Sequence, residues 1–347
     1  LIEDRSTNGT WVNVSKLQPR RLHLLVHGDE ICIAPSSHTD QIRFIFNCPN
    51  ATQPSSILLP ELLNKYHITE TVGSGAFAKV LKAVHRQSGI TYAVKAIQTK
   101  LPLAANAIER EISVLMSLHH PNIVALHETY KQPSHTYLIL DYVPNGDLMD
   151  HILNAGPLSE RDSSSVLSQI LDAIHYVHSR GISHRDLKPE NILIQSLSPI
   201  RVKVCDFGLA KANGPSSLLK TFCGTFAYLA PEILQSRSAS PTSPQKVYSN
   251  AVDIWSIGCI AYVSLTASFP FNGVTQDEMH RSIVSATFLM APLKQARTSQ
   301  NAIDFLSFLL QPNPEKRPTA LSAMQHVWLL GNSSVLSEIE SSDNNAY

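Results

Sequence analysis

The chain has 347 residues, and its 28 Lys and Arg residues balance 28 Asp and Glu residues, so the formal net charge at neutral pH is zero. This balance gives no general attraction to nucleic acid or to a membrane surface. No apolar run approaches the roughly 18 residues that a membrane span requires. The five cysteines form no CxxC pair or Cys/His cluster, which argues against a disulfide framework and a zinc site and favours a reducing compartment.

Residues 1–48 have the pattern of short strands and turns. In IRFIF at residues 42–46, Ile42, Phe44 and Phe46 alternate with Arg43 and Ile45, and DRSTNGTWVN at residues 4–13 contains an Asn-Gly turn signal. So short a piece buries too little surface to close a β-sandwich. The start of the chain has no signal-peptide pattern, and the absence of an initiating Met indicates a fragment. Residues 49–65 begin with PNATQPSSILLP, whose prolines and serines predict a linker.

Residues 66–143 predict a β-rich unit. Two strand patterns flank a Ser88-Gly89 turn, an amphipathic helix follows, and two more strands end near Val143. The apolar face of that helix is formed by Ile108, Ile112, Leu115 and Met116.

Residues 144–331 predict a mainly helical unit. Its clearest helix begins after Ser159, which forms a capping-box variant with Asp162, continues to Arg180 and is ended by Gly181. The Ser/Pro-rich stretch 235–249 predicts a surface insertion, and residues 332–347 predict a polar tail. The fold class is therefore α+β, with a small β-rich lobe before a larger helical lobe.

Two segments carry the chemistry. The segment ISHRDLKPENILI, residues 182–194, is followed closely by KVCDFGLAK, residues 203–211, and together they resemble the catalytic and metal-binding segments of protein kinases. The resemblance implies a bilobal kinase fold over residues 66–331, with the lobes divided at 143/144. It implies that Asp186 accepts the proton of the acceptor hydroxyl, that Lys188 reaches the transferred phosphate, and that Asn191 and Asp206 bind Mg²⁺.

A glycine-rich stretch in the β-rich lobe resembles the nucleotide loop of the same family. On its own, VGSGAFAKV at residues 72–80 is more often a plain hairpin, but it precedes Ala93-Val94-Lys95 by about twenty residues, as in kinases. Lys95 would bind the α- and β-phosphates and pair with Glu111. The third glycine of the loop is replaced by Ala78. The residues expected to contact ATP are Val72, Gly73, Gly75, Val80, Ala93, Lys95, Leu140, Asp141, Val143, Leu193 and Asp206.

The resemblance also implies how the lobe is held together and regulated. Asp253 would accept backbone N–H groups of the catalytic loop, and Glu232 would pair with Arg317. A phosphate on Thr221 would bridge Arg185 and Lys211, and Thr225 is a second expected phosphorylation site. Phe226 stands where most relatives have Pro. Asp147 and Glu190 would flank the substrate cleft, as in Ser/Thr kinases that prefer Arg upstream of the target residue.

With a kinase behind it, DRSTNGTWVN resembles the closing motif of the forkhead-associated (FHA) domain, a β-sandwich that binds phosphothreonine peptides. The resemblance extends to about Cys48 and implies that Thr7 and Asn8 reach the peptide; the alternative is a plain Asn-Gly hairpin. It covers only the last part of such a domain, so phosphopeptide binding is expected only when the complete domain is present.

An FHA domain before a kinase of the calmodulin-dependent group is similar to the checkpoint kinase two family, including its fungal members. That family implies ATP and Mg²⁺ as cofactors, protein substrates with basic residues upstream of Ser or Thr, a transient homodimer, and a nuclear location shared with the cytoplasm. It implies no direct binding of nucleic acid or membranes. The alternatives are a non-catalytic scaffold with a kinase fold, and a kinase of the calmodulin-dependent group outside the checkpoint pathway.

Overall fold

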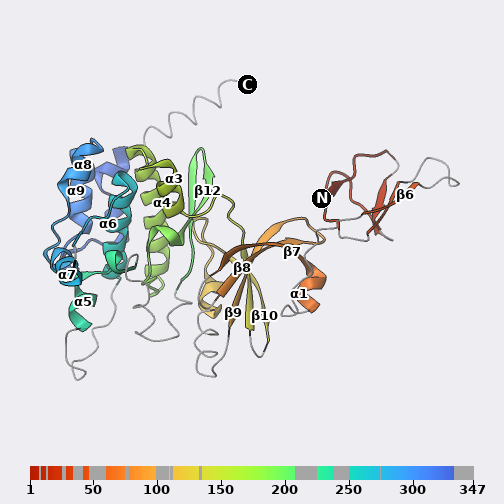
Figure 1. The fold of residues 1–347 in the computed structure, drawn as a ribbon, viewed down its shortest axis with the longest axis horizontal. Helices are drawn as coiled ribbons and strands as arrows, with labels where there is room; N and C mark the ends of the chain where they lie inside the picture. Colours follow the sequence, from red (N-terminus) through yellow and green to blue (C-terminus); the bar gives the residue numbers. More distant parts are fainter. Residues whose placement is uncertain are drawn as a thin grey trace. The chain divides into compact units, whose positions relative to one another are not determined.

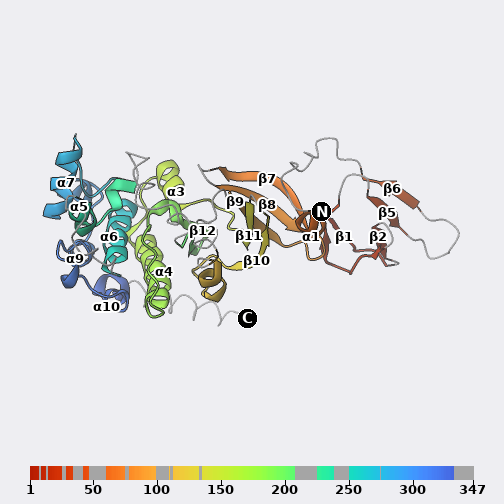
Figure 2. The ribbon, with the colours of Figure 1, turned by 90° about the horizontal axis from the view of Figure 1, so that it is seen from below.

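The computed structural model describes residues 1–7, 9–12, 15–25, 29–33, 42–46, 60–74, 78–98, 109, 112–132, 135–207, 225–237, 250–273 and 275–331. The chain divides into two compact units: residues 1–105 with 126–142, and residues 106–125 with 143–347. Figures 1 and 2 draw most of the strands in the first unit, and the β12-β13 hairpin and most of the helices in the second. Within the described residues, no helix is both long and apolar enough to cross a membrane.

The N-terminal residues form two small antiparallel sheets. One has the strand order β3-β2-β5-β6 and the other pairs β1 with β4. The strands are β1 (Ile2–Glu3), β2 (Thr10–Val12), β3 (Ser15–Lys16), β4 (Leu22–His23), β5 (Glu30–Ile33) and β6 (Ile42–Ile45). Val12 and Cys32 are buried, whereas Phe44 and Ile45 are exposed. The alternating stretch at 42–46 thus forms the predicted strand, at the edge of a sheet with an exposed apolar surface.

The rest of the first unit is a five-stranded antiparallel sheet in the order β10-β11-β9-β8-β7, with helix α1 before it. Its elements are α1 (Pro60–Lys65), β7 (Tyr66–Ser74), β8 (Ala78–His85), β9 (Thr91–Gln98), β10 (Leu126–Lys131) and β11 (His135–Asp141). The turn between β8 and β9 has Gly89 at φ +71°, a conformation that glycine adopts without strain.

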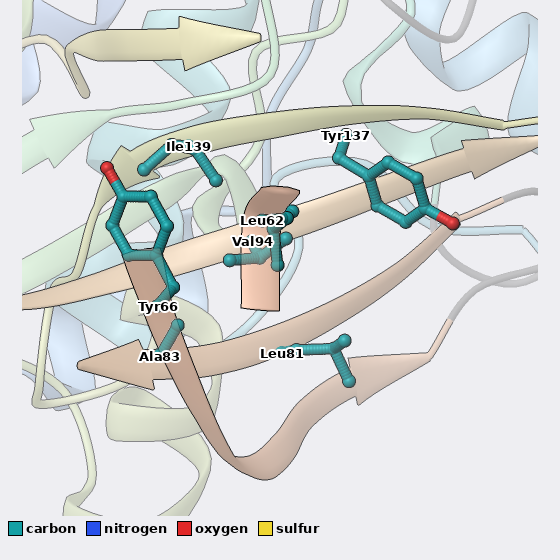
Figure 3. Close-up of a cluster of buried hydrophobic side chains, with 7 residues drawn as sticks. All are labelled: Leu62, Tyr66, Leu81, Ala83, Val94, Tyr137 and Ile139. Carbon is teal, nitrogen blue, oxygen red and sulfur yellow. The ribbon is translucent and has the colours of Figure 1, made fainter. Parts of the chain in front are cut away.

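The two faces of this sheet carry different residues, because successive side chains along each strand point to opposite faces. One face carries a buried cluster that includes Leu81 and Ala83 of β8, Val94 of β9, and Tyr137 and Ile139 of β11. Figure 3 shows these side chains gathered with Leu62 and Tyr66. The residues next to these in sequence lie on the opposite face, as the strand registers require: Val80, Lys82, Ala93, Lys95, Leu138 and Leu140.

Helix α1 differs from the sequence expectation. Residues 49–65 were predicted as a linker, but residues 60–65 form a helix whose Leu62 is 0% exposed and belongs to the buried cluster of the sheet. The chain is also fastened there by Arg86, whose Nε donates to the carbonyl of Leu63 at 2.9 Å. The end of the predicted linker is therefore part of the lobe's core.

The second unit is built on two helices. Helix α4 contacts α6 and the β-hairpin of β12 and β13, and Figures 1 and 2 both draw α4 beside α6. Helix α6 is buried on all sides from Val252 to Leu265, as expected for a helix that is apolar around its circumference. The elements of the second unit are α3 (Leu148–Ala155), α4 (Glu160–His178), η1 (Pro189–Asn191), β12 (Ile192–Leu197), β13 (Ile200–Val204), η4 (Thr225–Tyr228), α5 (Pro231–Arg237), α6 (Ala251–Thr266), α7 (Gln276–Ser285), α8 (Met290–Gln295), α9 (Gln300–Leu309), η5 (Pro314–Lys316) and α10 (Ala320–Met324).

Local sequence signals account for the ends of these helices. The Ser159 hydroxyl accepts from the Asp162 N–H at 3.1 Å and donates to the Asp162 carboxylate at 2.7 Å, which confirms the predicted cap of α4. One expectation for the preceding helical segment, residues 112–117, is wrong: Ile112 and Leu115 are buried, but Met116 is 43% exposed.

Candidate active site

Asp253, in the first turn of α6, holds the backbone of the catalytic loop. Its two carboxylate oxygens accept the N–H groups of His184 at 2.8 Å and Arg185 at 2.7 Å, which are the predicted contacts. His178, at the end of α4, adds a third bond at 2.8 Å. Burial acts to raise the pKa of Asp253, but these hydrogen bonds hold it below its ordinary value. The loop is thus tied to the most buried helix of the lobe.

His184 fixes the next residues of the loop. Burial lowers its pKa, so the imidazole is neutral at neutral pH. Its Nε2 lies 2.8 Å from the carbonyl oxygen of Cys205, and its Nδ1 accepts the N–H of Asp186 at 3.3 Å. The tautomer with the proton on Nε2 satisfies both bonds. The ring also packs against Phe207, with 4.7 Å between centroids.

Three predicted functional side chains come together at the loop. The Asn191 side-chain N–H donates to the carbonyl of Asp186 at 2.7 Å and to its carboxylate at 3.3 Å, and Lys188 Nζ lies 3.5 Å from the same carboxylate. Asp186 and Lys188 are both partly exposed, with side-chain exposures of 20% and 21%. A carboxylate beside an ammonium at a partly open position suits the transfer of a proton next to a developing negative charge.

Asp206 is brought beside this group by the hairpin of β12 and β13. Ile192 pairs with Val204, so Asn191 and Cys205 lie together at the hairpin's end, and the Cys205 N–H donates to the Asn191 carbonyl at 2.9 Å. Asp206 is exposed and has φ +62°, and Arg185 has φ +67°; both are strained values for residues with a side chain. Asn191 uses its amide nitrogen on Asp186, so its amide oxygen and the carboxylate of Asp206 are the oxygen donors that follow from this end of the hairpin. This pair of oxygen donors fits Mg²⁺.

The β-rich unit carries several of the predicted nucleotide residues on one face of its sheet. Val80 lies opposite Lys95, and Ala93 lies opposite both Lys82 and Leu140 in the neighbouring strands. Gly73 pairs with Val80, and Val72 beside it is 53% exposed. Val80, Ala93, Lys95 and Leu140 therefore share one face, away from the buried cluster of Figure 3, whereas Asp141 pairs with Tyr92 and lies on the other face.

The helical unit carries the other residues predicted to contact the nucleotide and the substrate. Leu193 lies on β12 and forms a bridge with Asp147, and Val143 is the first residue of the longer segment of the unit. Asp147 also caps α3, because its carboxylate accepts the Asp150 N–H at 2.9 Å. Burial raises the pKa of Asp147.

Glu190 is the least satisfied acid of the site. Its pKa is raised by burial first, and the negative charges of Asp147 and Asp186 raise it further against the opposing charge of Lys188. Its Oε2 is buried and has no hydrogen-bond partner among the described residues. Two carboxylates that disfavour each other's ionisation make a place that attracts a cation.

The predicted ion pair of Glu232 and Arg317 is present and doubly hydrogen-bonded. The guanidinium nitrogens lie 2.8 and 2.7 Å from the two carboxylate oxygens, and the Arg317 side chain is 0% exposed. Arg317 also donates to the carbonyls of Gln311 and Ala251 and packs 5.0 Å from the ring of Trp255. This pair joins α5 to the segment before α10 and has a structural task.

Several predicted residues lie outside the described residues: Asn8, Gly75, Glu111, Lys211 and Thr221. Thr225 begins η4, but its side chain is not described, and the same holds for Phe226. Thr7 is exposed in the N-terminal turn, where Asp4 accepts from Ser6 and Thr10. His178 was not predicted; its position in the last turn of α4, before the glycine stop, was the available signal.

Comparisons with known proteins place these features in a family. The protein kinase domain model matches residues 66–329, and the FHA domain model matches residues 1–34. Serine/threonine-protein kinase RAD53 of Saccharomyces cerevisiae is 39% identical over 368 residues, covering 95% of this chain but only 45% of that protein. Serine/threonine-protein kinase cds1 of Schizosaccharomyces pombe is 38% identical over 338 residues, covering 94% of this chain and 72% of that protein. The crystal structure of Rad53 1-466 in complex with AMP-PNP has a TM-score of 0.68 at 38% identity, covering 94% of this chain and 81% of that one.

Proposed function

The chain belongs to the serine/threonine protein kinases that carry an FHA domain, and from this premise we propose that it transfers the γ-phosphate of ATP to Ser and Thr residues of proteins in checkpoint signalling. The single observation that carries the catalytic part is the convergence of Lys188 and Asn191 on the carboxylate of Asp186. A non-catalytic scaffold would have no need of this convergence, nor of the anchoring of the same loop to Asp253.

Each residue has a task that its chemistry suits. Asp186 accepts the proton of the acceptor hydroxyl, and its bond from Asn191 keeps the carboxylate in one orientation. Lys188 supplies positive charge beside it, and the family resemblance assigns Lys95 to the α- and β-phosphates of ATP. ATP with Mg²⁺ supplies the phosphoryl group and the charge that neutralises it; Asn191 and Asp206 would hold the metal ion. The related Rad53 structure contains AMP-PNP, which supports ATP as the nucleotide here.

The acidic pair supports a basic substrate. Glu190 has a buried oxygen without a hydrogen-bond partner among the described residues, and the negative charge of Asp147 raises its pKa. An arginine side chain placed between the two carboxylates would restore hydrogen bonds and relieve their repulsion. We infer that the substrate carries Arg upstream of the phosphorylated residue.

Regulation and cellular role follow from the family resemblance. A phosphate on Thr221 would join Arg185 to Lys211 and order the activation segment, with Thr225 as a second site. The FHA part would bind phosphothreonine peptides in a protein that carries the complete domain, and a transient homodimer would allow one copy to phosphorylate another. A checkpoint role and a nuclear location are supported by the likeness to RAD53 and cds1.

The test compares peptides and acidic variants. Phosphate transfer is measured to a Ser peptide with Arg three residues upstream, to the same peptide with Ala there, and to one with Tyr as acceptor. The wild type should prefer the Arg peptide by about tenfold in kcat/KM, the effect of one charged hydrogen bond, and should leave the Tyr peptide unmodified.

Two isosteric variants and a control locate the preference. Glu190→Gln and Asp147→Asn should each reduce it, and Asn at position 147 retains the cap of α3. Asp304→Asn, which changes an exposed acid of α9, should leave it intact. Equal transfer to the Arg and Ala peptides would contradict the proposed substrate class.

A further inference from the structure

Strand β10 contains a β-bulge where it pairs with β11, the last strand before the junction of the two units at residues 142 and 143. Between β10 and β11, Leu126 pairs with Leu140 but Glu128 pairs with Ile139, so two steps along β10 match one step along β11. His127 is the extra residue. A bulge of this kind redirects a side chain and often lies beside an active site.

The bulge directs His127 at the last residue of β11. Its Nε2 lies 2.8 Å from Oδ1 of Asp141, and since a carboxylate only accepts hydrogen bonds, Nε2 carries the proton. The imidazole also meets the edge of Tyr92 with 5.1 Å between centroids, and Tyr92 is the residue of β9 that pairs with Asp141. Asp141 is therefore held from both neighbouring strands.

The next residue has a contact of its own. Lys82 Nζ lies 5.0 Å from the centre of the Tyr142 ring and 2.9 Å from the carboxylate of Glu70, its partner across β7 and β8. The pKa of Lys82 is raised first by the hydrogen bond that Lys82 donates to Glu70, so the cation is favoured at this place. Lys82 lies on the same face of the sheet as Ala93, Lys95 and Leu140.

These contacts act where the chain leaves the sheet. The first compact unit ends at Tyr142, and β11 ends at Asp141. The last residue of a strand tends to fray when only the backbone ladder holds it. Here two consecutive residues are fastened by side chains of three different strands.

We propose that His127 and Lys82 are positioning residues that hold Asp141 and Tyr142, and with them the backbone of residues 141–143, which we call the hinge, in place for the adenine of ATP. The proposal rests on the proposed function, because it requires ATP to bind along the face of Ala93 and Leu140. His127 and Lys82 touch no reacting atom; they act through the hinge. Loosening either contact raises the dissociation constant for ATP and leaves the chemical step unchanged.

The experiment measures binding separately from catalysis. The dissociation constant for ATP with Mg²⁺ is determined by calorimetry without peptide, and kcat at saturating ATP is measured beside it. His127→Leu removes the donor and should raise the dissociation constant about tenfold, with kcat within twofold of wild type. His127→Gln keeps an N–H donor and should restore affinity to within about twofold.

Two controls separate positioning from general destabilisation. His135→Leu removes a histidine at the other end of β11 and should leave ATP affinity unchanged. If His127→Leu fails to fold, Tyr142→Leu and Tyr142→Phe decide: Phe keeps the ring under Lys82 and should bind ATP as wild type does, whereas Leu should bind it several-fold more weakly.

Three results would overturn the proposal. The first is wild-type ATP affinity in both His127→Leu and Tyr142→Leu. The second is an equal loss of ATP affinity in His127→Gln and His127→Leu. The third is a loss of ATP affinity in His135→Leu as large as that in His127→Leu. A wild-type protein that does not bind ATP at all would refute the proposed function itself, and the proposal with it.

Discussion

Removing Glu232 should destabilise the helical lobe more than any exposed charge does. The Arg317 side chain is 0% exposed and that of Glu232 is 13% exposed, so the pair lies out of water. Glu232→Gln keeps the shape but leaves a buried guanidinium without its counter-charge, and one of its N–H groups would face the new amide N–H₂. Breaking a buried pair in this way costs about 3–5 kcal/mol. For a lobe of this size, that corresponds to a fall in melting temperature on the order of 10 °C.

The assay is urea unfolding followed by tryptophan fluorescence, with calorimetry for the melting temperature. Lys316→Ala removes an exposed charge one residue from Arg317 and should change the unfolding free energy by less than about 0.5 kcal/mol. The double variant Glu232→Leu/Arg317→Met removes both charges and should be more stable than Glu232→Gln. A cost below about 1 kcal/mol for Glu232→Gln, the value of a surface pair, would refute the reasoning.

Three further predictions concern the core and the effect of pH. Leu62→Ala should lower the unfolding free energy by about 2–5 kcal/mol, because the side chain is fully buried among the sheet residues of Figure 3. Glu61→Ala, at an exposed position of the same helix, should change the unfolding free energy little. Equal effects of the two substitutions in urea unfolding would show that α1 is not part of the core. Burial raises the pKa of Glu190, so on acidification its carboxylate becomes neutral at a higher pH than a free glutamate does. As the pH falls, KM for the Arg peptide should begin to rise at the pH where Glu190 becomes neutral, while KM for the Ala peptide stays constant. Glu190→Gln should flatten the rise for the Arg peptide. Burial lowers the pKa of His184, so the unfolded state binds a proton more readily than the folded state. The contribution of His184 to the unfolding free energy is therefore complete above its ordinary pKa of 6.5 and declines as the pH falls below that value. If the urea midpoint of His184→Asn depends on pH as strongly as that of the wild type, this prediction is wrong.

The predictable part of the structure depends on local sequence. The cap at Ser159 and the edge strand at Ile42–Ile45 follow from residues within a few positions of each other, so they are visible without a fold. The catalytic loop is similar: Asp186, Lys188 and Asn191 are close in sequence, and their side chains meet. The contact of Asp253 with this loop joins residues 68 and 69 positions apart, and only the family resemblance predicted it.

The missed features arise from tertiary packing. Helix α1 is too short to show a helical period, and its Leu62 is buried because it packs with sheet residues such as Leu81 and Tyr137, which are 19 and 75 positions away. Met116 has the spacing of a buried residue, but it is exposed where the helix reaches the surface. His127 is directed at Asp141 by a bulge, and a bulge depends on the pairing of two strands.

The measurement that tests the central claim most directly is single-turnover transfer of phosphate from radiolabelled ATP and Mg²⁺ to the Arg peptide, in wild type and in Asp186→Ala. The account predicts transfer by the wild type, and a loss of at least about a hundredfold in Asp186→Ala while ATP affinity stays within a few-fold. No transfer by a wild-type protein that binds ATP, or equal transfer by both proteins, would contradict the claim that this site is a kinase active site.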